Sequence, residues 1–392
     1  MRKTFVGLGT LLASALAAAS ASAQQAVKVG VVMSYSGQFA DPGAQIDNGI
    51  KLYMKQNGHT VAGKKLDLIR KDSGGIAPDV AKRLSQEVIV REGAEILAGY
   101  DLTPNALAAA DVSAQAKKFM VNMNAATSVI TTKSPYMART SFTVWAVNEE
   151  LGKWAFRNGV KKAYTLVSDF GPGHDGEAAF TKGFKDAGGE IIGSARYPVA
   201  NIDFTAFLQR AKDSSPDGIY IWVPGGPQPA AIGKAIAERG IDKNKIKVMG
   251  QGELTYEDAL KSMGDAGLGL ITAFHYDFNH QSAKNKAFVA AYNADFKRNP
   301  DMFSVGGYDG MHLIYEALKK TNGNTDGEAL IAAAKGMKWE SPRGPMMIDP
   351  ETRDVVETVY IRRVEKVGGQ LLNVEFDKIE DVKDPWKARQ PK

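Results

Sequence analysis

Short apolar segments alternate with longer amphipathic segments along most of the chain. Residues 27–33 form an apolar run, and the segment that follows repeats Ile46, Ile50, Tyr53 and Met54 at positions i, i+4, i+7 and i+8. This spacing places the four side chains on one face of a helix. The alternation of a short strand with an amphipathic helix predicts an α/β fold, with a mostly parallel sheet that helices cover on both faces.

The alternation restarts after Phe142 and changes character near the end of the chain. Strand-like runs at residues 163–167 and 219–223 are separated by helical segments, which indicates a second α/β half. Residues 355–362 and 371–376 instead look like antiparallel β structure. Because strands return after two α/β halves, the pattern predicts two lobes joined by several chain crossings.

The first residues have the three-part pattern of a secretory signal peptide. Arg2 and Lys3 precede an apolar stretch at residues 5–19, and small residues follow in an A-x-A pattern that ends at Ala23. The alternative is an N-terminal membrane anchor, but the stretch is rich in alanine and shorter than the roughly 20 apolar residues of a membrane span. We therefore expect residues 1–23 to be a signal peptide that is cleaved after Ala23, which makes the protein periplasmic.

Charge and cysteine content narrow the class of protein. The formal net charge is +5 over 392 residues, and loss of Arg2 and Lys3 with the signal peptide would lower it further. The basic residues are scattered, so we expect no nucleic-acid partner. The chain has no cysteine, which excludes disulfides, thiolate metal ligands, a cysteine nucleophile and a lipid-modified cysteine.

One glycine-rich segment fits a dinucleotide-binding motif. Gly171, Gly173 and Gly176 form G-x-G-x-x-G between a predicted strand and a predicted helix. The acidic residue expected about 20 positions later is missing, because Glu190 precedes the next strand and Tyr197 ends it. A dinucleotide-dependent enzyme is therefore a minor alternative.

No constellation for catalysis or metal binding stands out. The five histidines include no H-E-x-x-H pair, and no G-x-S-x-G elbow occurs. No pair of Asp or Glu residues has a spacing that distinguishes it from the charged residues of an ordinary protein surface. We therefore expect no metal, no cofactor and no enzymatic reaction, and binding becomes the leading hypothesis.

Six segments follow predicted strands and combine glycine, hydroxyl or amide groups with aromatic side chains. Ligands of open α/β sheets bind beyond the carboxyl ends of the strands, so these segments should meet at one edge. Their chemistry is typical of a small-molecule cleft, although each one alone could be an ordinary turn. The segments are residues 34–39, 100–105, 122–127, 169–173, 224–227 and 251–253.

At these segments the chain resembles the leucine/isoleucine/valine-binding protein family, the periplasmic receptors of branched-chain amino-acid-type ABC transporters. The resemblance covers essentially the whole chain after the signal peptide, and it rests on an ordered set of short matches. These are Val29-Gly30-Val31-Val32, Ser36-Gly37, Asn124-Ala125-Ala126-Thr127, Arg139-Thr140, Met249-Gly250 and Gly252-Glu253.

The resemblance implies a two-lobed periplasmic-binding-protein fold of type I. Each lobe would be a mostly parallel sheet flanked by helices. Three interlobe crossings are expected near Phe142, Thr272 and Ile348. The implied boundaries are residues 24–142 and 272–347 for lobe 1, and residues 143–271 and 348–392 for lobe 2.

The resemblance also implies a clamp for a ligand carboxylate in the first lobe. The family holds this carboxylate with a hydroxyl group and with backbone N–H groups. The positions that match are Thr103, Asn124, Ala125 and Thr127. A carboxylate on the ligand is therefore expected.

Other matching positions bear on the rest of the ligand. A family tyrosine that closes on the ligand matches Tyr308, and the family's acidic partner for a ligand ammonium matches Gly252 or Glu253. Gly173 and Gly225 stand where the family has two aromatic side chains of the second lobe. Glu253 would bind the ammonium of an amino acid. For a ligand without an amine, we expect it to face solvent or to cap the helix that follows it.

Four aromatic residues could fill the space that the two glycines leave, namely Phe39, Tyr100, Trp145 and Phe170. The resemblance thus leaves two ligand classes open, an aromatic or other organic acid and a branched-chain or other amino acid. In either case we expect a monomer that passes a small-molecule ligand to the inner-membrane permease subunits of an ABC importer. The alternative is a sensing subunit of a periplasmic signalling pathway, which would use the same cleft.

Overall fold

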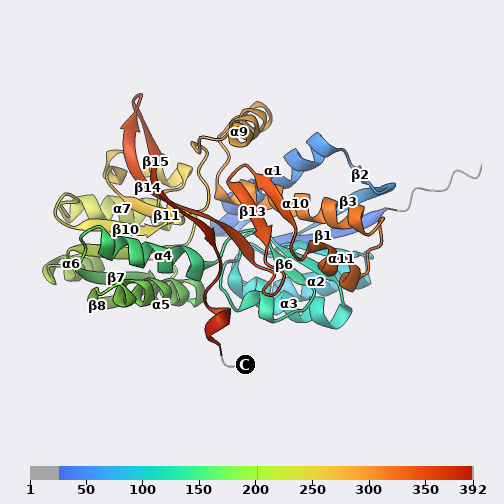
Figure 1. Ribbon diagram of the computed structural model, residues 1–392, viewed down its shortest axis with the longest axis horizontal. Coiled ribbons are helices and arrows are strands. Elements are labelled where there is room, and N and C mark those ends of the chain that lie inside the picture. Colours follow the sequence, from blue (N-terminus) through green and yellow to red (C-terminus); the bar gives the residue numbers. More distant parts are fainter. Residues whose placement is uncertain (1–25, 201, 391–392) are drawn as a thin grey trace, which may run out of the picture.

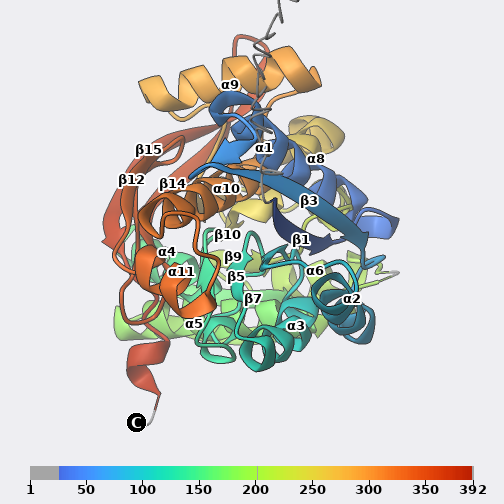
Figure 2. The same ribbon diagram turned by 90° about the vertical axis from the view of Figure 1, so that its right-hand side faces the viewer.

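The computed structural model describes residues 26–200 and 202–390, and the predicted signal peptide at residues 1–23, cleaved after Ala23, lies outside them. Within the described residues the strands form two sheets, and helices pack around both (Figures 1 and 2). We call each sheet with its helices a lobe; the first lies to the right in Figure 1 and the second to the left. The predicted two-lobed α/β fold is confirmed.

The first lobe is built on a sheet with the strand order β2-β3-β1-β4-β5-β6. Strand β2 is antiparallel to β3, and the other neighbours are parallel. Three helices from later in the chain join this lobe, and the longest of them, α10, packs along α1. The elements are β1 (Val27–Met33), α1 (Ala40–Asn57), β2 (Thr60–Val61), β3 (Lys64–Asp72), α2 (Pro78–Val90), β4 (Ile96–Gly99), α3 (Thr103–Ala116), β5 (Phe119–Asn122), β6 (Met137–Arg139), α9 (Ala283–Phe296), α10 (Met302–Lys320) and α11 (Gly327–Ala334).

The second lobe is built on a sheet with the order β12-β13-β14-β11-β10-β9-β7-β8, and β15 pairs with β14. Strands β7 to β11 are parallel, and β12 to β15 are antiparallel to their neighbours, as the late segments predicted. The elements are α4 (Val144–Arg157), β7 (Lys162–Ser168), α5 (Gly171–Asp186), β8 (Glu190–Tyr197), α6 (Thr205–Asp213), β9 (Gly218–Trp222), α7 (Gln228–Glu238), β10 (Lys247–Gln251), η3 (Gly252–Thr255), α8 (Glu257–Met263), β11 (Ile271–Phe274), β12 (Lys338–Ser341), β13 (Gly344–Ile348), β14 (Val355–Val367) and β15 (Gln370–Val382).

The expected crossings can be compared with the strand pairing. The first falls between β6 and α4, on either side of Phe142. Thr272 lies inside β11, which pairs with β10 and β14, so the chain leaves the second sheet only after Phe274. Ile348 ends β13, which also belongs to this sheet, so the return of the chain precedes β12. The pairing therefore places the second crossing a few residues later than expected, after Phe274, and the third one earlier, before Lys338.

Two arginines whose side chains are almost fully buried hold the crossing segments together, and we call Arg139 and Arg343 the hinge arginines. Arg139 Nε lies 3.1 Å from Asp354 Oδ1, and its other nitrogens donate to the carbonyl oxygens of Ala125 at 3.1 Å and Thr127 at 2.9 Å. A buried guanidinium is stable only when its charge and its donors are satisfied. Arg139 therefore ties the turn after β5 to the segment that enters β14.

Arg343 performs the same task for the other crossing segments. Its guanidinium lies 3.0 Å from Glu357 Oε2 and 3.1 Å from Asp309 Oδ2, and it donates to the carbonyl oxygen of Ser141 at 2.7 Å. These partners belong to β14, to α10 and to the first crossing. Two separate groups of buried ion pairs, one at each hinge arginine, thus join the lobes and the segments between them.

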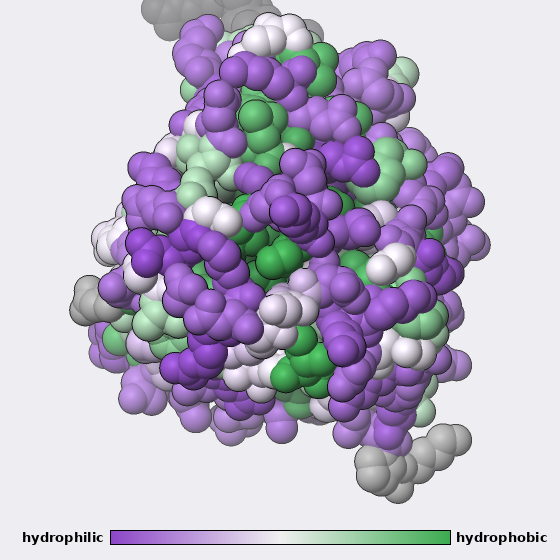
Figure 3. All heavy atoms as spheres, turned by 90° about the vertical axis from the view of Figure 1, so that its left-hand side faces the viewer, coloured by the Kyte–Doolittle hydropathy of each residue, from purple (hydrophilic) through white to green (hydrophobic). Residues whose placement is uncertain are grey.

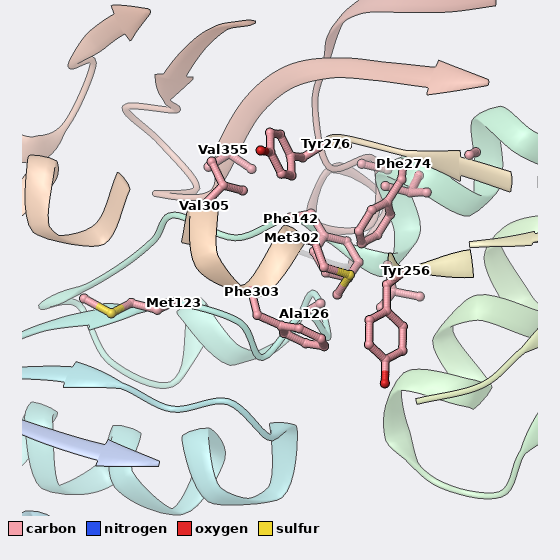
Figure 4. Close-up of a cluster of buried hydrophobic side chains, with 14 of the residues drawn as sticks. Met123, Ala126, Phe142, Tyr256, Phe274, Tyr276, Met302, Phe303, Val305 and Val355 are labelled. Carbon is pink, nitrogen blue, oxygen red and sulfur yellow. The ribbon is translucent and has the colours of Figure 1, made fainter. Parts of the chain in front are cut away.

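Apolar packing is continuous between the lobes. One cluster of buried side chains includes members of both sheets, and Figure 4 shows Phe142, Phe274 and Val355 gathered where the chain crosses. The outer end of the second lobe is hydrophilic over most of its surface, with small hydrophobic areas (Figure 3). Among the described residues, no helix has both the length and the apolar character of a membrane span.

Candidate functional site

A pocket lies between the lobes at the carboxyl ends of the parallel strands. Its empty space is about 470 Å³, a volume that includes space open to solvent. Both lobes contribute to its lining. The predicted residues that line it are Phe39, Thr103, Asn124, Ala125, Phe170, Gly225 and Glu253.

Aromatic side chains form much of the pocket wall. Phe39, Phe142 and Phe303 come from the first lobe and the first crossing, and Phe170 and Trp222 come from the second lobe. The rings of Phe170 and Trp222 pack edge to face, with centroids 5.5 Å apart. Phe303 and Phe142 lie near Ala126, another lining residue (Figure 4). Such walls favour a flat, apolar ligand body.

Two helices begin at the pocket, one from each lobe. Helix α3 starts at Thr103 and α5 starts at Gly171, and neither helix has a side chain that caps its first N–H groups. A Cβ added to Gly171 would lie 3.7 Å from Thr103 Cγ2 and 3.9 Å from Thr127 Oγ1, so the two N-termini face each other closely. The second residue of each helix is a proline and has no N–H, but the other first-turn N–H groups and the positive ends of the two helix dipoles converge here, which favours binding of an anion.

The predicted carboxylate clamp contributes hydroxyl groups to this place. Thr103 Oγ1 and Thr127 Oγ1 are 2.9 Å apart, and both residues are buried. Asn124 Nδ2 donates to the carbonyl oxygen of Asp101 at 2.7 Å, so its amide nitrogen holds the loop. Arg139 donates hydrogen bonds to the carbonyl oxygens of Ala125 and Thr127, and these bonds fix the turn that carries the predicted clamp.

Glu253 lines the pocket from the second lobe. Its Oε2 accepts a hydrogen bond of 2.7 Å from Gln251 Nε2. Asn148 Nδ2 donates to Gln251 Oε1 at 3.4 Å, and Asn148 Oδ1 accepts in turn from the Tyr220 hydroxyl at 2.8 Å. Burial raises the pKa of Glu253 to about 8, which favours the neutral acid near pH 7. Glu253 is buried at the pocket and makes no capping bond to α8, so it takes neither of the positions that were expected for it with a ligand that lacks an amine.

Asp101 is a second acid at the pocket, and it was not among the predicted site residues. It is buried, and its Oδ2 accepts a hydrogen bond of 3.1 Å from the backbone N–H of Ser34. Burial raises the pKa of Asp101 to about 6. One signal could have found it, since it lies between an apolar strand and the predicted clamp residue Thr103.

Two of the predicted residues lie beneath the pocket instead of lining it. Tyr100 is fully buried, and its hydroxyl lies 2.8 Å from Ser85 Oγ. Gly173 is in the first turn of α5, where an added Cβ would lie 1.9 Å from the Ser168 carbonyl oxygen. Gly173 therefore permits close packing of α5 on β7 and does not leave space for a ligand.

Tyr308 was expected to close on the ligand, but it does not line the pocket. Its hydroxyl donates to Gln56 Oε1 at 2.7 Å, and its ring packs edge to face on Tyr53 with centroids 5.0 Å apart. Both partners belong to α1. Tyr308 therefore joins α10 to α1 inside the first lobe. Thr127 is an intermediate case, since it does not line the pocket itself but bonds to Thr103, which does.

A further contact between the lobes involves exposed charges. Arg298 lies between α9 and α10, and its guanidinium contacts Asp41 of α1 at 2.7 Å and Asp258 of α8. Beside it, Asn299 Nδ2 donates to Glu257 Oε1 of α8 at 3.0 Å. We call this group of residues the Arg298 contact. It joins the first lobe to the second without any chain crossing.

The described part of the chain was searched for side chains that could bind a metal ion or carry out catalysis. There, no group of three or more His, Cys, Asp or Glu side chains is arranged to hold a metal ion. The residues that line the pocket also include no nucleophile with an adjacent base. The arrangement supports binding of an anionic group next to an aromatic surface.

Comparison with known proteins agrees with this geometry. The family described as "Periplasmic binding protein" matches residues 26–370. A Brucella melitensis protein named "Leu/Ile/Val-binding protein homolog 6" is 41% identical over 379 residues, which are 96% of this chain and 97% of the relative.

Solved structures extend the similarity to proteins with bound ligands. A solute-binding protein of an ABC transporter from Rhodopseudomonas palustris BisB5, in complex with 3,4-dihydroxybenzoic acid, is 53% identical with a TM-score of 0.89, over 92% of this chain and 99% of that chain. Another from R. palustris HaA2, in complex with p-hydroxybenzoic acid, is 41% identical with a TM-score of 0.90, over 93% of this chain and 100% of that chain.

Proposed function

Because the chain belongs to the periplasmic binding protein family, we propose that it is a periplasmic receptor that delivers an aromatic carboxylate to an ABC permease. Binding of a small solute for an ABC transporter is the function of its structural relatives. We further propose that the receptor is a monomer, that it releases its ligand chemically unchanged, and that its signal peptide is cleaved after Ala23.

The observation that carries the proposal is the meeting of the α3 and α5 N-termini beside aromatic walls. A carboxylate between Thr103 and Gly171 would receive backbone N–H groups from both lobes and a hydroxyl hydrogen from the threonine pair. The ring attached to it would lie against Phe170, Trp222 and Phe303. The solved relatives with bound hydroxybenzoic acids support the same ligand class.

The proposed anion site also explains how ligand binding would close the two lobes. Thr103 and Thr127 belong to the first lobe and Gly171 to the second, so the ligand carboxylate interacts with both halves only when the lobes are close. A ligand that binds the closed form better shifts the population toward it. The ligand-bound form is then the one that the permease is proposed to receive.

An amino acid is the second candidate, and two observations favour it. The Brucella relative is named as a Leu/Ile/Val-binding protein homolog, and Glu253 offers an acid to a ligand ammonium. The raised pKa of Glu253 counts against it, because the acid would have to ionise in a buried place before it could pair with an ammonium. We therefore place the aromatic carboxylate first.

Calorimetry and thermal unfolding of the purified protein test the proposal. Benzoate, 4-hydroxybenzoate and 3,4-dihydroxybenzoate should bind, and each at about 100 times its Kd should add roughly 2.7 kcal/mol to the free energy of unfolding. Leucine, valine and phenylalanine are the comparison ligands. Binding of the amino acids without binding of any aromatic acid would contradict the proposal.

Three simpler measurements test the proposed monomer, the release of an unchanged ligand and the cleavage site. Light scattering should give the mass of one chain, and mass spectrometry should recover the ligand unchanged after incubation. N-terminal sequencing of the periplasmic protein should begin at Gln24. Ligand uptake by vesicles that contain the permease would separate transport from a purely sensing role, since a sensing subunit would bind the ligand without uptake.

A further inference from the structure

Two buried acids line the pocket from opposite lobes. Asp101 lies between β4 and α3 in the first lobe, and Glu253 lies in η3 in the second. We propose that these two side chains bind hydroxyl groups of the ligand, so that the receptor selects phenolic acids over aromatic acids without a hydroxyl group. This inference rests on the proposed function, because it names the subclass of aromatic carboxylate that the same pocket takes.

Asp101 has hydrogen-bonding capacity that its neighbours leave unused. The side chain is 2% exposed, and Oδ2 accepts from the Ser34 N–H. Oδ1 is buried and makes no hydrogen bond of normal geometry within residues 26–200 and 202–390. The nearby Ser34 hydroxyl, which partly offsets the effect of burial on the pKa of Asp101, is likewise unpaired. A buried oxygen without a partner is costly. A ligand hydroxyl at Asp101 would supply the missing donor.

Glu253 is in a similar state on the other wall. It is 6% exposed, and Gln251 Nε2 donates to Oε2. In the described part of the chain nothing bonds to Oε1. The Gln251 amide is held with its oxygen toward Asn148 Nδ2, so its nitrogen faces Glu253. Because Oε2 already accepts a hydrogen, the acid proton belongs on Oε1, where it can meet a ligand oxygen.

The pocket offers these acids no positive partner. Among its described lining residues there is no lysine, arginine or histidine. An acid that is buried without a cation favours its neutral form, and the pKa values of both acids are raised for this reason. A neutral carboxyl group can both donate to a hydroxyl group and accept from it. Hydroxyl groups therefore suit Glu253, which is mainly neutral near pH 7 and can donate or accept, and they suit Asp101, whose pKa of about 6 leaves it mainly ionised, as an acceptor.

The test compares ligands that differ only at the ring. Calorimetry on the unaltered protein should give benzoate and 4-methoxybenzoate a Kd about tenfold or more above that of 4-hydroxybenzoate or 3,4-dihydroxybenzoate. The methyl ether keeps the ring oxygen but removes its hydrogen, so it separates donation from size. Equal affinity across the series would overturn the inference and leave the proposed function intact. If none of these acids binds, both fail.

Variants then assign the preference to the two residues. Glu253→Met and Asp101→Leu remove the acids at similar volume and should each reduce the ratio of benzoate Kd to 4-hydroxybenzoate Kd toward one. Glu380→Met, on the exposed part of β15, is the matched control and should keep the wild-type ratio. A wild-type ratio in both folded pocket variants would overturn the assignment. If one variant does not fold, the ligand series on the unaltered protein and the other variant still decide.

Discussion

The two lobes are joined by ion pairs of two kinds, which differ in burial. At the hinge, Arg139 and Asp354 are 0% and 1% exposed. In the Arg298 contact, the Arg298 side chain is 26% exposed and its partners Asp41 and Asp258 are 42% and 35% exposed. A buried charge that loses its partner is costly, whereas an exposed pair contributes little. The difference teaches that the hinge network should stay intact while the lobes move, and the Arg298 contact should open.

The largest expected effect is at the hinge. Asp354→Asn keeps the shape but leaves Arg139 and Lys387 without their shared carboxylate, so the free energy of unfolding should fall by about 3–5 kcal/mol. Urea unfolding of the unliganded protein measures this. Asp41→Asn in the Arg298 contact is the matched control and should cost below about 1 kcal/mol. Similar costs at the two places would break the comparison.

The next largest effect is expected at the two threonines of the predicted carboxylate clamp in the interlobe pocket. Thr103→Val removes the hydroxyl group at the N-terminus of α3, and affinity for the aromatic carboxylate should fall by about 1.5–3 kcal/mol. Thr127→Val should act in the same direction, because its hydroxyl is paired with that of Thr103. Calorimetry measures both. Thr60→Val on exposed β2 is the control, and a loss of stability without a loss of affinity would contradict the clamp.

A third effect comes from a buried acid without a cation. The pKa of Glu253 is raised to about 8 in the folded protein, so the folded state holds this proton more tightly than the unfolded state. Stability should therefore fall as the pH rises from the unfolded pKa toward 8, by about 1.4 kcal/mol per pH unit at the steepest. Glu253→Gln should remove this part of the slope. Identical slopes in the two proteins would show that Glu253 is ionised in the folded state.

The smallest effect is expected in the Arg298 contact. Arg298→Ala should change the free energy of unfolding by less than about 1 kcal/mol. It should weaken ligand binding slightly, because the contact joins the lobes, and the weakening should shrink at high salt. Calorimetry at low and high ionic strength measures this. A salt-independent loss as large as that of Thr103→Val would mean that the exposed contact stabilises the closed form as strongly as the ligand does.

The sequence was sufficient to predict those pocket residues whose position depends on the carboxyl end of a strand. Thr103, Ala125 and Glu253 each follow a buried parallel strand within a few residues, and the carboxyl ends of such strands meet at one edge. The alternation of apolar segments was also sufficient for the two sheets, because a strand that is covered on both faces must be short and apolar. These predictions depend on local spacing, which a single sequence carries.

The direction of a side chain was harder to predict. Helix α10 is buried around most of its circumference, so its periodicity does not show which face meets the pocket, and Phe303 of its first turn lines the pocket while Tyr308 does not. Trp222 ends β9 and reads as an ordinary core residue. Gly173 matched a position of the family, but close packing of α5 on Ser168 explains it better. Such cases depend on contacts between distant segments.

The approach of Gly171 to Thr103 also has a consequence for kinetics. If each lobe carries half of the proposed anion site, a ligand held by both halves cannot leave until they separate. The dissociation rate then cannot exceed the rate of lobe opening, however weak the individual contacts are. A membrane partner that pulls the lobes apart would shorten the residence time of the ligand without touching it. Unloading would in that case be a mechanical event, timed by the transporter.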